Sequence, residues 1–407
     1  MDAQLKAELE FQNDRAMWDS SELARDALGL VKKDIEGGMI SLVYGLRRTG
    51  KTFLAHQLIS GYRAPFYFSF DKLAFQKPDV LEETIRFALA EGADIIALDE
   101  IQKVQGWSGI VKGYYDHQKP RPSFLLTGSS SIGLKKGGES LAGRMLERQL
   151  PALSYPEYLR FAGIGAKFRM DKADDYMREG AFPEVVLRGH EPARYARSVV
   201  DKIVGEDLPQ LYSIEHPEHL PDIVRMLAER IGGKVDYRDL SSSLGISKDT
   251  VKRYIVFLEK SFLIDIVMAH GKHGAAVGKN KKAYFAHPQI ASAYCQLSPG
   301  QAAENAVYCH LRQFGQVGFF TSGRSEIDFV LSADGVDIPI EVKWQNSMRP
   351  SDTLEVRKFM EMRGTDGIMI TKNEEETLEI GQMKLRLIPL HEFLFSQESP
   401  LFLRRHK

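Results

Sequence analysis

Apolar residues in the first half of the chain fall into short runs that alternate with longer segments of helical periodicity. The periodic segments predict helices such as Lys51–Ser60 and Val80–Ala90. Alternation of strands and helices is typical of a mostly parallel sheet with helices on both faces. The pattern therefore predicts an α/β fold to about residue 200, with strands at Ile40–Tyr44, Pro65–Phe70, Asp94–Leu98 and Ser123–Thr127.

The pattern changes twice after this first block. Residues 201–299 are mainly helical, and the last block begins with a helix at Gln301–Phe314 and continues as short strands and turns. A chain of 407 residues has room for two or three domains. We therefore expect three domains, at 1–200, 201–299 and 300–407.

Composition is that of a globular protein, with 43% hydrophobic and 27% charged residues. The net charge of −1 means that any surface for nucleic acid must be local. The two cysteines, Cys295 and Cys309, are too few for a disulfide scaffold or a cysteine-rich zinc module. The N-terminus lacks a signal-peptide core, and no apolar run approaches the ~20 residues that span a bilayer. We expect a cytoplasmic protein without a membrane segment.

Residues 45–52 read GLRRTGKT, the full G-x-x-x-x-G-K-T pattern of a phosphate-binding loop, between a predicted strand and a predicted helix. Backbone N–H groups of such a loop and the helix N-terminus attract phosphate. Lys51 is expected to reach the β- and γ-phosphates of ATP, and the Thr52 hydroxyl to ligate Mg²⁺. The expected ATP-binding residues are Gly45, Leu46, Arg47, Arg48, Thr49, Gly50, Lys51, Thr52 and Phe53.

Hydrolysis of ATP requires acidic residues near this loop. The predicted strand at 94–98 is followed by Asp99 and Glu100. Asp99 is expected to hold the Mg²⁺ shell, and Glu100 to polarise the attacking water as general base.

Two further segments carry candidates for the γ-phosphate. Thr127 and Ser129 end a predicted strand, and either would contact the γ-phosphate or its water, unless the segment is an ordinary capped turn. Arg144, with Arg148 in reserve, is the candidate for stabilising transition-state charge in its own or a neighbouring subunit. A structural salt bridge is the competing interpretation for both arginines.

Taken together, these motifs resemble the AAA+-superfamily ATPases of bacteria and archaea. More narrowly, they resemble the group of these ATPases that carries a C-terminal region of unassigned function. The resemblance implies an αβα ATPase domain, a winged helix and a restriction-nuclease-like domain. It is carried by YGLRRTGKT at 44–52, LDEIQ at 98–102, LTGSS at 126–130, LAGR at 141–144, LSYPEY at 153–158 and GAFPE at 180–184.

Residues 236–254 have the pattern of a helix-turn-helix, with Gly245 in the turn and Ser247 as the cap of the second helix. Leu263–Met268 and Ala283–Phe285 are predicted to form the strands of a wing. The apolar residues of the second helix, which recur at helical spacing and should be buried, are Val251, Tyr254, Ile255 and Leu258.

Basic residues of this block are candidates for contact with DNA phosphates or bases. Packing or contact with a protein is the alternative use of the same fold. The candidates are Lys248, Lys252 and Arg253 on the second helix, and Lys272, His273, Lys279, Lys281 and Lys282 at the tip of the wing.

The last block contains a predicted hairpin with Asp328 on one strand and Glu341 and Lys343 on the next. Residues two apart on a strand share a face, so Glu341 and Lys343 point the same way. Asp328 and Glu341 would hold a second Mg²⁺ or Mn²⁺ with Lys343 beside it, and Glu304 on the preceding helix is a further acid. The pattern resembles the PD-(D/E)xK nuclease signature. A salt-bridged surface is the alternative.

The sequence thus predicts an ATP-hydrolysing, DNA-binding protein, with Mg²⁺-dependent DNA cleavage as the expected second activity. Two other functions stay open. One is a nucleotide-dependent switch that binds a protein partner, and the other is a DNA binder whose nuclease-like domain does not cleave. An arginine acting across subunits would require a homo-oligomer.

Overall fold

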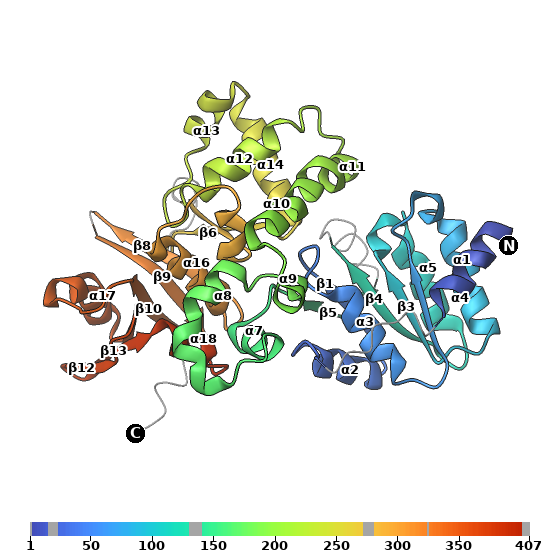
Figure 1. Ribbon diagram of the computed structural model, residues 1–407, viewed down its shortest axis with the longest axis horizontal. Coiled ribbons are helices and arrows are strands. Elements are labelled where there is room, and N and C mark those ends of the chain that lie inside the picture. The colour runs from blue at the N-terminus through green and yellow to red at the C-terminus, as the bar shows by residue number, and fades with distance from the viewer. Residues whose placement is uncertain (1, 15–22, 130–140, 272–280, 324, 401–407) are drawn as a thin grey trace. The chain divides into compact units, whose positions relative to one another are not determined.

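The computed structural model describes residues 2–14, 23–129, 141–271, 281–323 and 325–400 (Figure 1). The chain folds into two compact units. The first comprises Met1–Pro151 with Lys260–Phe262, and the second comprises Ala152–Glu259 with Leu263–Lys407. Among the helices of the described ranges, none combines the length and apolar character needed to cross a membrane.

A five-stranded sheet in the order β2-β3-β4-β1-β5 forms the centre of the first unit, and every pairing is parallel. Its first four strands confirm the predicted positions to within one or two residues. The fifth was missed because it has half-buried and exposed residues and no apolar run. The strands are β1 (Ile40–Tyr44), β2 (Pro65–Ser69), β3 (Ile95–Asp99), β4 (Ser123–Gly128) and β5 (Met145–Gln149).

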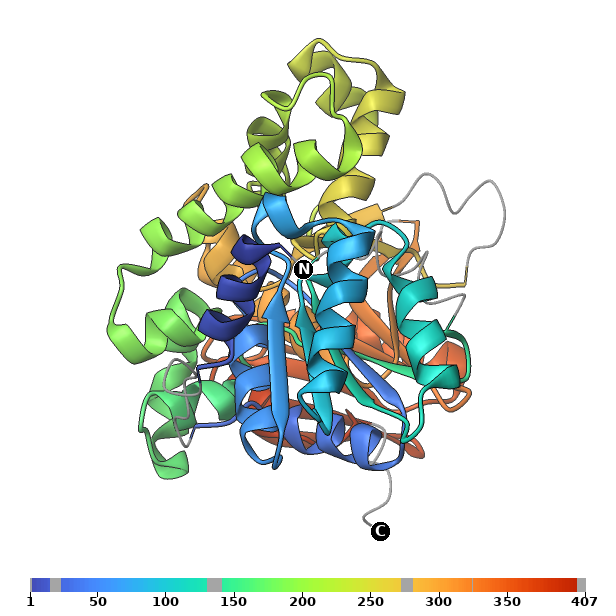
Figure 2. The same ribbon diagram turned by 90° about the vertical axis from the view of Figure 1, so that its right-hand side faces the viewer.

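Helices cover both faces of this sheet. The helices α1 (Ala3–Gln12), α4 (Pro78–Ala90) and α5 (Trp107–His117) share one apolar core with the sheet, and Figure 2 views the unit from this side. The helices α2 (Leu28–Glu36) and α3 (Lys51–Ser60) share the core on the other face. The 3₁₀ turns η2 (Leu73–Phe75) and η3 (Ile101–Lys103) follow β2 and β3. This arrangement confirms the predicted α/β fold, and the unit that contains it ends at Pro151 apart from Lys260–Phe262.

Side chains at the end of α1 cover the free edge of β2. The Asn13 side chain accepts from the Tyr67 N–H at 2.9 Å and donates to the Tyr67 carbonyl at 3.0 Å. The Gln12 Oε1 accepts from the Ser69 N–H at 2.7 Å. These bonds replace the partners that a further strand would offer, and an uncovered edge would invite pairing with another chain.

The second unit begins with a helical region. The predicted helix-turn-helix is present as α13 and α14: Gly245 has a φ of 68°, and the Ser247 hydroxyl accepts from the Thr250 N–H at 3.0 Å. The predicted face of α14 is buried. The elements are α7 (Tyr155–Phe161), η5 (Ala166–Lys172), α8 (Ala173–Glu179), α9 (Pro183–Arg188), α10 (Pro192–Lys202), the π-helical η6 (Ile203–Asp207), α11 (Leu208–Tyr212), α12 (His219–Ala228), α13 (Tyr237–Leu244), α14 (Lys248–Lys260), the antiparallel strands β6 (Ile264–Met268) and β7 (Lys281–Phe285), and α15 (Pro288–Ser292).

A six-stranded mixed sheet in the order β12-β13-β11-β10-β9-β8 completes the second unit. The helix α17 packs on one face, and α16 and α18 pack on the other (Figure 1). The elements are α16 (Pro299–Leu311), β8 (Gln316–Ser322), β9 (Ser325–Ala333), β10 (Val336–Lys343), η8 (Pro350–Thr353), α17 (Leu354–Arg363), β11 (Gly367–Thr371), β12 (Glu376–Ile380), β13 (Met383–Pro389) and α18 (Leu390–Phe395).

The pairing of β8 with β9 is irregular at one point. Gly318 pairs with Val330 and Phe320 pairs with Ile327, so Asp328 and Phe329 lie opposite Phe319 alone. An extra residue of this kind bends a strand and changes the direction of a side chain. The predicted hairpin of β9 and β10 is therefore present, with a bulge at Asp328.

We expect the substitution Asn13→Ala to lower the free energy of unfolding of the first unit by about 1–3 kcal/mol, because it leaves two backbone groups of Tyr67 without their partners. Urea denaturation followed by circular dichroism would measure the change. Gln4→Ala, at an exposed position of the same helix, is the control and should stay within about 0.5 kcal/mol of wild type. Equal stability of the two variants would contradict the role of Asn13 at the sheet edge.

Candidate functional site

The phosphate-binding loop joins β1 to α3 at the carboxyl end of the parallel sheet. Lys51 Nζ donates to the Gly45 and Leu46 carbonyls at 3.1 and 2.9 Å, and the Thr49 hydroxyl donates to the Leu46 carbonyl at 2.9 Å. Gly50 precedes α3 with a φ of 93°, so the loop turns directly into the helix N-terminus. These internal bonds hold the loop in a curled conformation around Lys51.

Two contacts hold the loop from behind. A Cβ at Gly45 would lie 2.3 Å from the Leu150 carbonyl oxygen, so only glycine fits there. The buried Arg25 guanidinium donates to the Thr49 carbonyl and, at 2.9 Å, to the Pro151 carbonyl. Arg25 was not among the predicted residues, because nothing in the sequence pattern links it to the loop.

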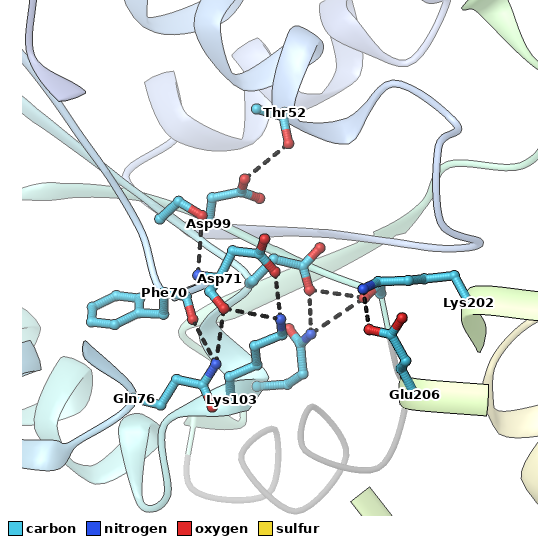
Figure 3. A network of polar contacts seen from close by, with 12 residues as sticks. Thr52, Phe70, Asp71, Gln76, Asp99, Lys103, Lys202 and Glu206 are labelled. Carbon is cyan, nitrogen blue, oxygen red and sulfur yellow. Dashed lines mark hydrogen bonds and ion pairs between the residues drawn. The ribbon is translucent and has the colours of Figure 1, made fainter. Parts of the chain in front are cut away.

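Asp99, the last residue of β3, is buried and accepts hydrogen bonds from three hydroxyl groups. Its Oδ2 accepts from Thr52 and from Tyr67, each at 2.8 Å, and its Oδ1 accepts from Thr127. Figure 3 shows the Thr52 hydroxyl directed at this carboxylate. The structure thus brings together Thr52, Asp99 and Thr127 as expected, and adds Tyr67 from β2.

Glu100 follows Asp99 in the left-handed region, with a φ of 54°. Its Oε2 accepts from the Ser129 hydroxyl at 2.8 Å and from Gln102 Nε2 at 2.5 Å. Ser129 therefore contacts the predicted general base, whereas Thr127 contacts the predicted Mg²⁺ ligand. The sequence did not distinguish these two roles.

Polar side chains also stabilise the segment that follows β2 at the same end of the sheet. Lys103 Nζ pairs with the Asp71 carboxylate, and Gln76 Nε2 donates to the Phe70 and Asp71 carbonyls at 3.2 and 3.1 Å (Figure 3). This segment therefore has a defined position next to Asp99 and Glu100.

The two candidate arginines form ion pairs within the first unit. Arg144 Nε donates to Asp116 at 2.7 Å. Arg148 makes two bonds, at 2.8 and 2.7 Å, to the buried Asp34. Arg148 lies in β5, and its guanidinium pairs with the buried Asp34 carboxylate. This contact corresponds to the competing interpretation of Arg148 as part of a structural salt bridge.

The candidate DNA-contacting residues differ in exposure. Lys248, Lys252 and Arg253 are exposed on α14, although Lys252 pairs with Asp249 at 2.8 Å. The prediction for Lys282 is wrong: it belongs to β7 and its side chain is only 1% exposed. Lys281 is half-buried over the Tyr237 ring. Lys272, His273 and Lys279 lie outside the described residues.

The predicted carboxylates of the last block do come together. Asp328 Oδ2 accepts from the Val342 N–H at 2.9 Å, and Glu341 Oε2 accepts from the Asp328 N–H at 3.1 Å. Lys343 Nζ donates to Glu341 Oε1 at 2.6 Å. The bulge in β9 and the end of β10 are thus joined through both carboxylates.

Lys282 fills the centre of this group. Its Nζ lies 2.7 Å from Glu326, 3.8 Å from Glu304 and 4.0 Å from Asp328. The Tyr284 hydroxyl, also from β7, donates to Glu304 at 2.7 Å. We call Lys282, Glu304, Glu326, Asp328, Glu341 and Lys343 the carboxylate–lysine cluster.

The turn after α12 packs closely against one carboxylate of the cluster. Gly232, with a φ of 75°, lies so near Glu304 that a Cβ there would be 2.3 Å from its Oε2. Burial, followed by the charge of Asp328, raises the pKa of Glu304 and of Glu341 to about 7. Burial alone would lower the pKa of Lys282, but the charges of Glu304 and Asp328 outweigh it and the pKa is raised.

Metal binding by the cluster was also predicted. Within the described ranges, no group of three or more His, Cys, Asp or Glu side chains is arranged to hold a metal ion. The ammonium of Lys282 instead lies within 4.0 Å of three of the carboxylates, those of Glu304, Glu326 and Asp328.

Comparison with known proteins finds three family matches along the chain. Residues 38–159 match an AAA domain family, 170–301 match the domain of unknown function DUF8612, and 299–393 match the domain of unknown function DUF4143. The chain carries an AAA domain. It is followed by two domains of unknown function, and the AAA domain is a P-loop NTPase domain.

Two similar proteins come from Methanocaldococcus jannaschii. Uncharacterized protein MJ1544 is 24% identical over 88% of this chain and 88% of its own length. Uncharacterized protein MJ1637 is 24% identical over 60% of this chain and 60% of its own length.

Two solved structures show partial similarity to this chain. The Holliday junction branch migration motor RuvB of Thermotoga maritima is 21% identical, with a TM-score of 0.35 over 61% of this chain and 92% of that one. AMPPCP-bound DnaA of Aquifex aeolicus is 17% identical, with a TM-score of 0.29 over 62% of this chain and 92% of the DnaA chain.

The raised pKa values predict a pH dependence of stability. Glu304 and Glu341 keep protons in the folded state that the unfolded chain releases between their usual pKa of 4.5 and about 7. Their contribution is present below pH 4.5 and is lost as pH rises through about 7, so the second unit should melt at lower temperature at pH 8 than at pH 5.5.

Thermal unfolding of wild type, Glu304→Gln and the exposed control Glu361→Gln at both pH values would test this. Wild type and the control should lose a few degrees more than Glu304→Gln. Identical pH dependence of the three proteins would contradict the assignment.

Proposed function

We propose that the AAA domain binds ATP with Mg²⁺ and hydrolyses it. The observation that carries the proposal is the 2.8 Å hydrogen bond between Thr52 of the phosphate-binding loop and Asp99 at the end of β3, with Glu100 as the next residue. A hydroxyl on the loop and a carboxylate on a neighbouring strand are the pair that holds Mg²⁺ beside a bound nucleotide in P-loop NTPases.

The residues of the loop divide the work of binding. Its N–H groups and the N-terminus of α3 attract the phosphates, and Lys51 exchanges the Gly45 and Leu46 carbonyls for phosphate oxygens. Thr52 and Asp99 would hold Mg²⁺, which supplies neutralisation of charge on the phosphates. Tight packing of Gly45 on Leu150 and the bond from Arg25 keep the loop in shape.

Glu100 is the general base in this proposal. It accepts the proton of the attacking water. Ser129 and Gln102 donate to the same Oε2, which holds the carboxylate in one orientation. Arg144 is the candidate for stabilising charge on the γ-phosphate in a homo-oligomer, where it would first have to leave Asp116.

Glu100→Gln should bind ATP as well as wild type but hydrolyse it at least about 100-fold more slowly, because the amide cannot accept the proton. Lys51→Ala should lose binding of ATP. Phosphate release and binding of a fluorescent ATP analogue measure the two effects, with Glu36→Gln on the exposed face of α2 as the control. Hydrolysis by Glu100→Gln at the wild-type rate would sink the assignment of the base.

The helical region supports a second function, which is contact with DNA. Lys248 and Arg253 are exposed on the second helix of a helix-turn-helix, next to the paired Lys252. Positive side chains on such a helix meet phosphates or base edges. We infer that this surface binds the sugar-phosphate backbone of DNA. The alternative is that it binds a protein partner.

We infer further that the carboxylate–lysine cluster does not cleave DNA in this arrangement. A nuclease needs its carboxylates free for a metal ion and its substrate. Here the Lys282 ammonium forms ion pairs with Glu304, Glu326 and Asp328. The last domain then holds DNA or a partner without cutting.

Labelled linear, single-stranded and branched DNA would be incubated with Mg²⁺ or Mn²⁺, with and without ATP, and with wild type, Lys51→Ala and Asp328→Ala/Lys343→Ala. We expect binding without a cut product. The affinity should fall with salt, and Lys248→Ala/Arg253→Ala should reduce the slope by about 2. A cut product that disappears in Asp328→Ala/Lys343→Ala would establish a nuclease and contradict our inference.

A further inference from the structure

Tyr67 is a polar residue at the nucleotide end of the sheet that the proposed mechanism has not used. It lies in β2 and is buried, and its hydroxyl donates to Asp99 Oδ2 at 2.8 Å. The same oxygen accepts from Thr52 at 2.8 Å, while the other accepts from Thr127. The Tyr67 hydroxyl therefore donates its one hydrogen bond to the carboxylate that is proposed to hold Mg²⁺.

The position of Tyr67 is fixed from two directions. Asn13 bonds to both backbone groups of Tyr67 and holds the edge strand. The ring of His56 on α3 meets the Tyr67 ring edge-on, with 4.4 Å between centroids. Burial, and then the charge of Asp99, raises the pKa of the Tyr67 hydroxyl well above its usual value, so the hydroxyl remains a donor.

The two donors to Oδ2 play different parts when Mg²⁺ is present. Thr52 is expected to turn its hydroxyl oxygen toward the metal ion, so its bond to Asp99 has to rearrange. Tyr67 lies in β2, outside the phosphate-binding loop, and has no such second task. Its bond therefore persists and keeps Asp99 in one orientation. Partners of this kind, which bind a metal-binding carboxylate from behind, commonly change metal affinity 10–100-fold.

We propose that Tyr67 is a positioning residue for the Mg²⁺ site: its hydroxyl orients Asp99 so that the carboxylate meets the metal ion and its waters. This inference rests on the proposed binding of ATP with Mg²⁺, but not on hydrolysis. It predicts that loss of the hydroxyl weakens the response to Mg²⁺ and leaves binding of the nucleotide without Mg²⁺ unchanged.

The test compares wild type, Tyr67→Phe and Tyr115→Phe in the full chain. Tyr115 is a matched control, because it is a buried tyrosine of the same unit whose hydroxyl donates to the Gly38 carbonyl, away from Asp99. Affinity for a fluorescent, non-hydrolysable ATP analogue would be measured in EDTA and over a series of free Mg²⁺ concentrations. ATP hydrolysis over the same series is the second readout, and circular dichroism checks the fold.

We expect Tyr67→Phe to match wild type in EDTA and to need about 10-fold more free Mg²⁺ for half of the Mg²⁺-dependent gain in affinity. Tyr115→Phe should follow the wild-type curve. A Tyr67→Phe curve that overlaps wild type would overturn the proposal. So would equal loss of affinity with and without Mg²⁺, since that pattern belongs to a residue that only supports the fold.

The experiment separates this inference from the proposed function. Wild type that binds the analogue in a Mg²⁺-dependent way but hydrolyses no ATP would contradict the proposed hydrolysis and leave the Tyr67 comparison valid. Wild type whose affinity does not respond to Mg²⁺ would overturn both the proposed Mg²⁺ site and the role of Tyr67.

Discussion

A buried carboxylate is the constraint on which the first unit depends. Asp99 lies at the end of the central parallel sheet, where an ionised group without partners would cost several kcal/mol. Hydroxyl groups from α3, β2 and β4 compensate it. Each of these elements must therefore be correctly positioned for the buried charge to be tolerated. The same positions bring the phosphate-binding loop next to Asp99 at the end of β3.

The second unit solves a similar problem with cations. Four carboxylates meet at β9, β10 and α16, and the ammonium groups of Lys282 and Lys343 lie among them. The difference has a consequence for function. Hydroxyl donors hold a carboxylate in place without a competing positive charge, whereas an ammonium occupies a position beside the carboxylate that a metal ion would need. In the proposed function Asp99 binds Mg²⁺, whereas the ion pairs of the carboxylate–lysine cluster join β7 to the C-terminal sheet.

Removing one member of such a cluster has a larger effect than forming it, because the remaining charge stays buried without a partner. The cluster therefore ties the strand β7 to the sheet through Lys282 and Tyr284. The glycine at 232 allows the helical region to approach Glu304 closely. The DUF8612 and DUF4143 regions consequently share one compact unit, and a change at the cluster would affect both.

The sequence by itself determined the features that depend on neighbouring residues. Helical spacing identified the buried face of α14, Ser247 and Gly245 marked its start, and the loop at 45–52 was recognised by its pattern. These features need only a few consecutive residues, whose backbone preferences and side-chain periodicity are local.

The tertiary structure alone decided which polar groups meet. The strand β5 has no apolar run, so only its pairing with β1 reveals it. Tyr67 reaches Asp99 because β2 and β3 are neighbours, and Lys282 reaches Asp328 because of a bulge in β9. Such contacts join segments far apart in the chain, and the free energy of a buried charge depends on every group around it. No pattern along the sequence carries that information.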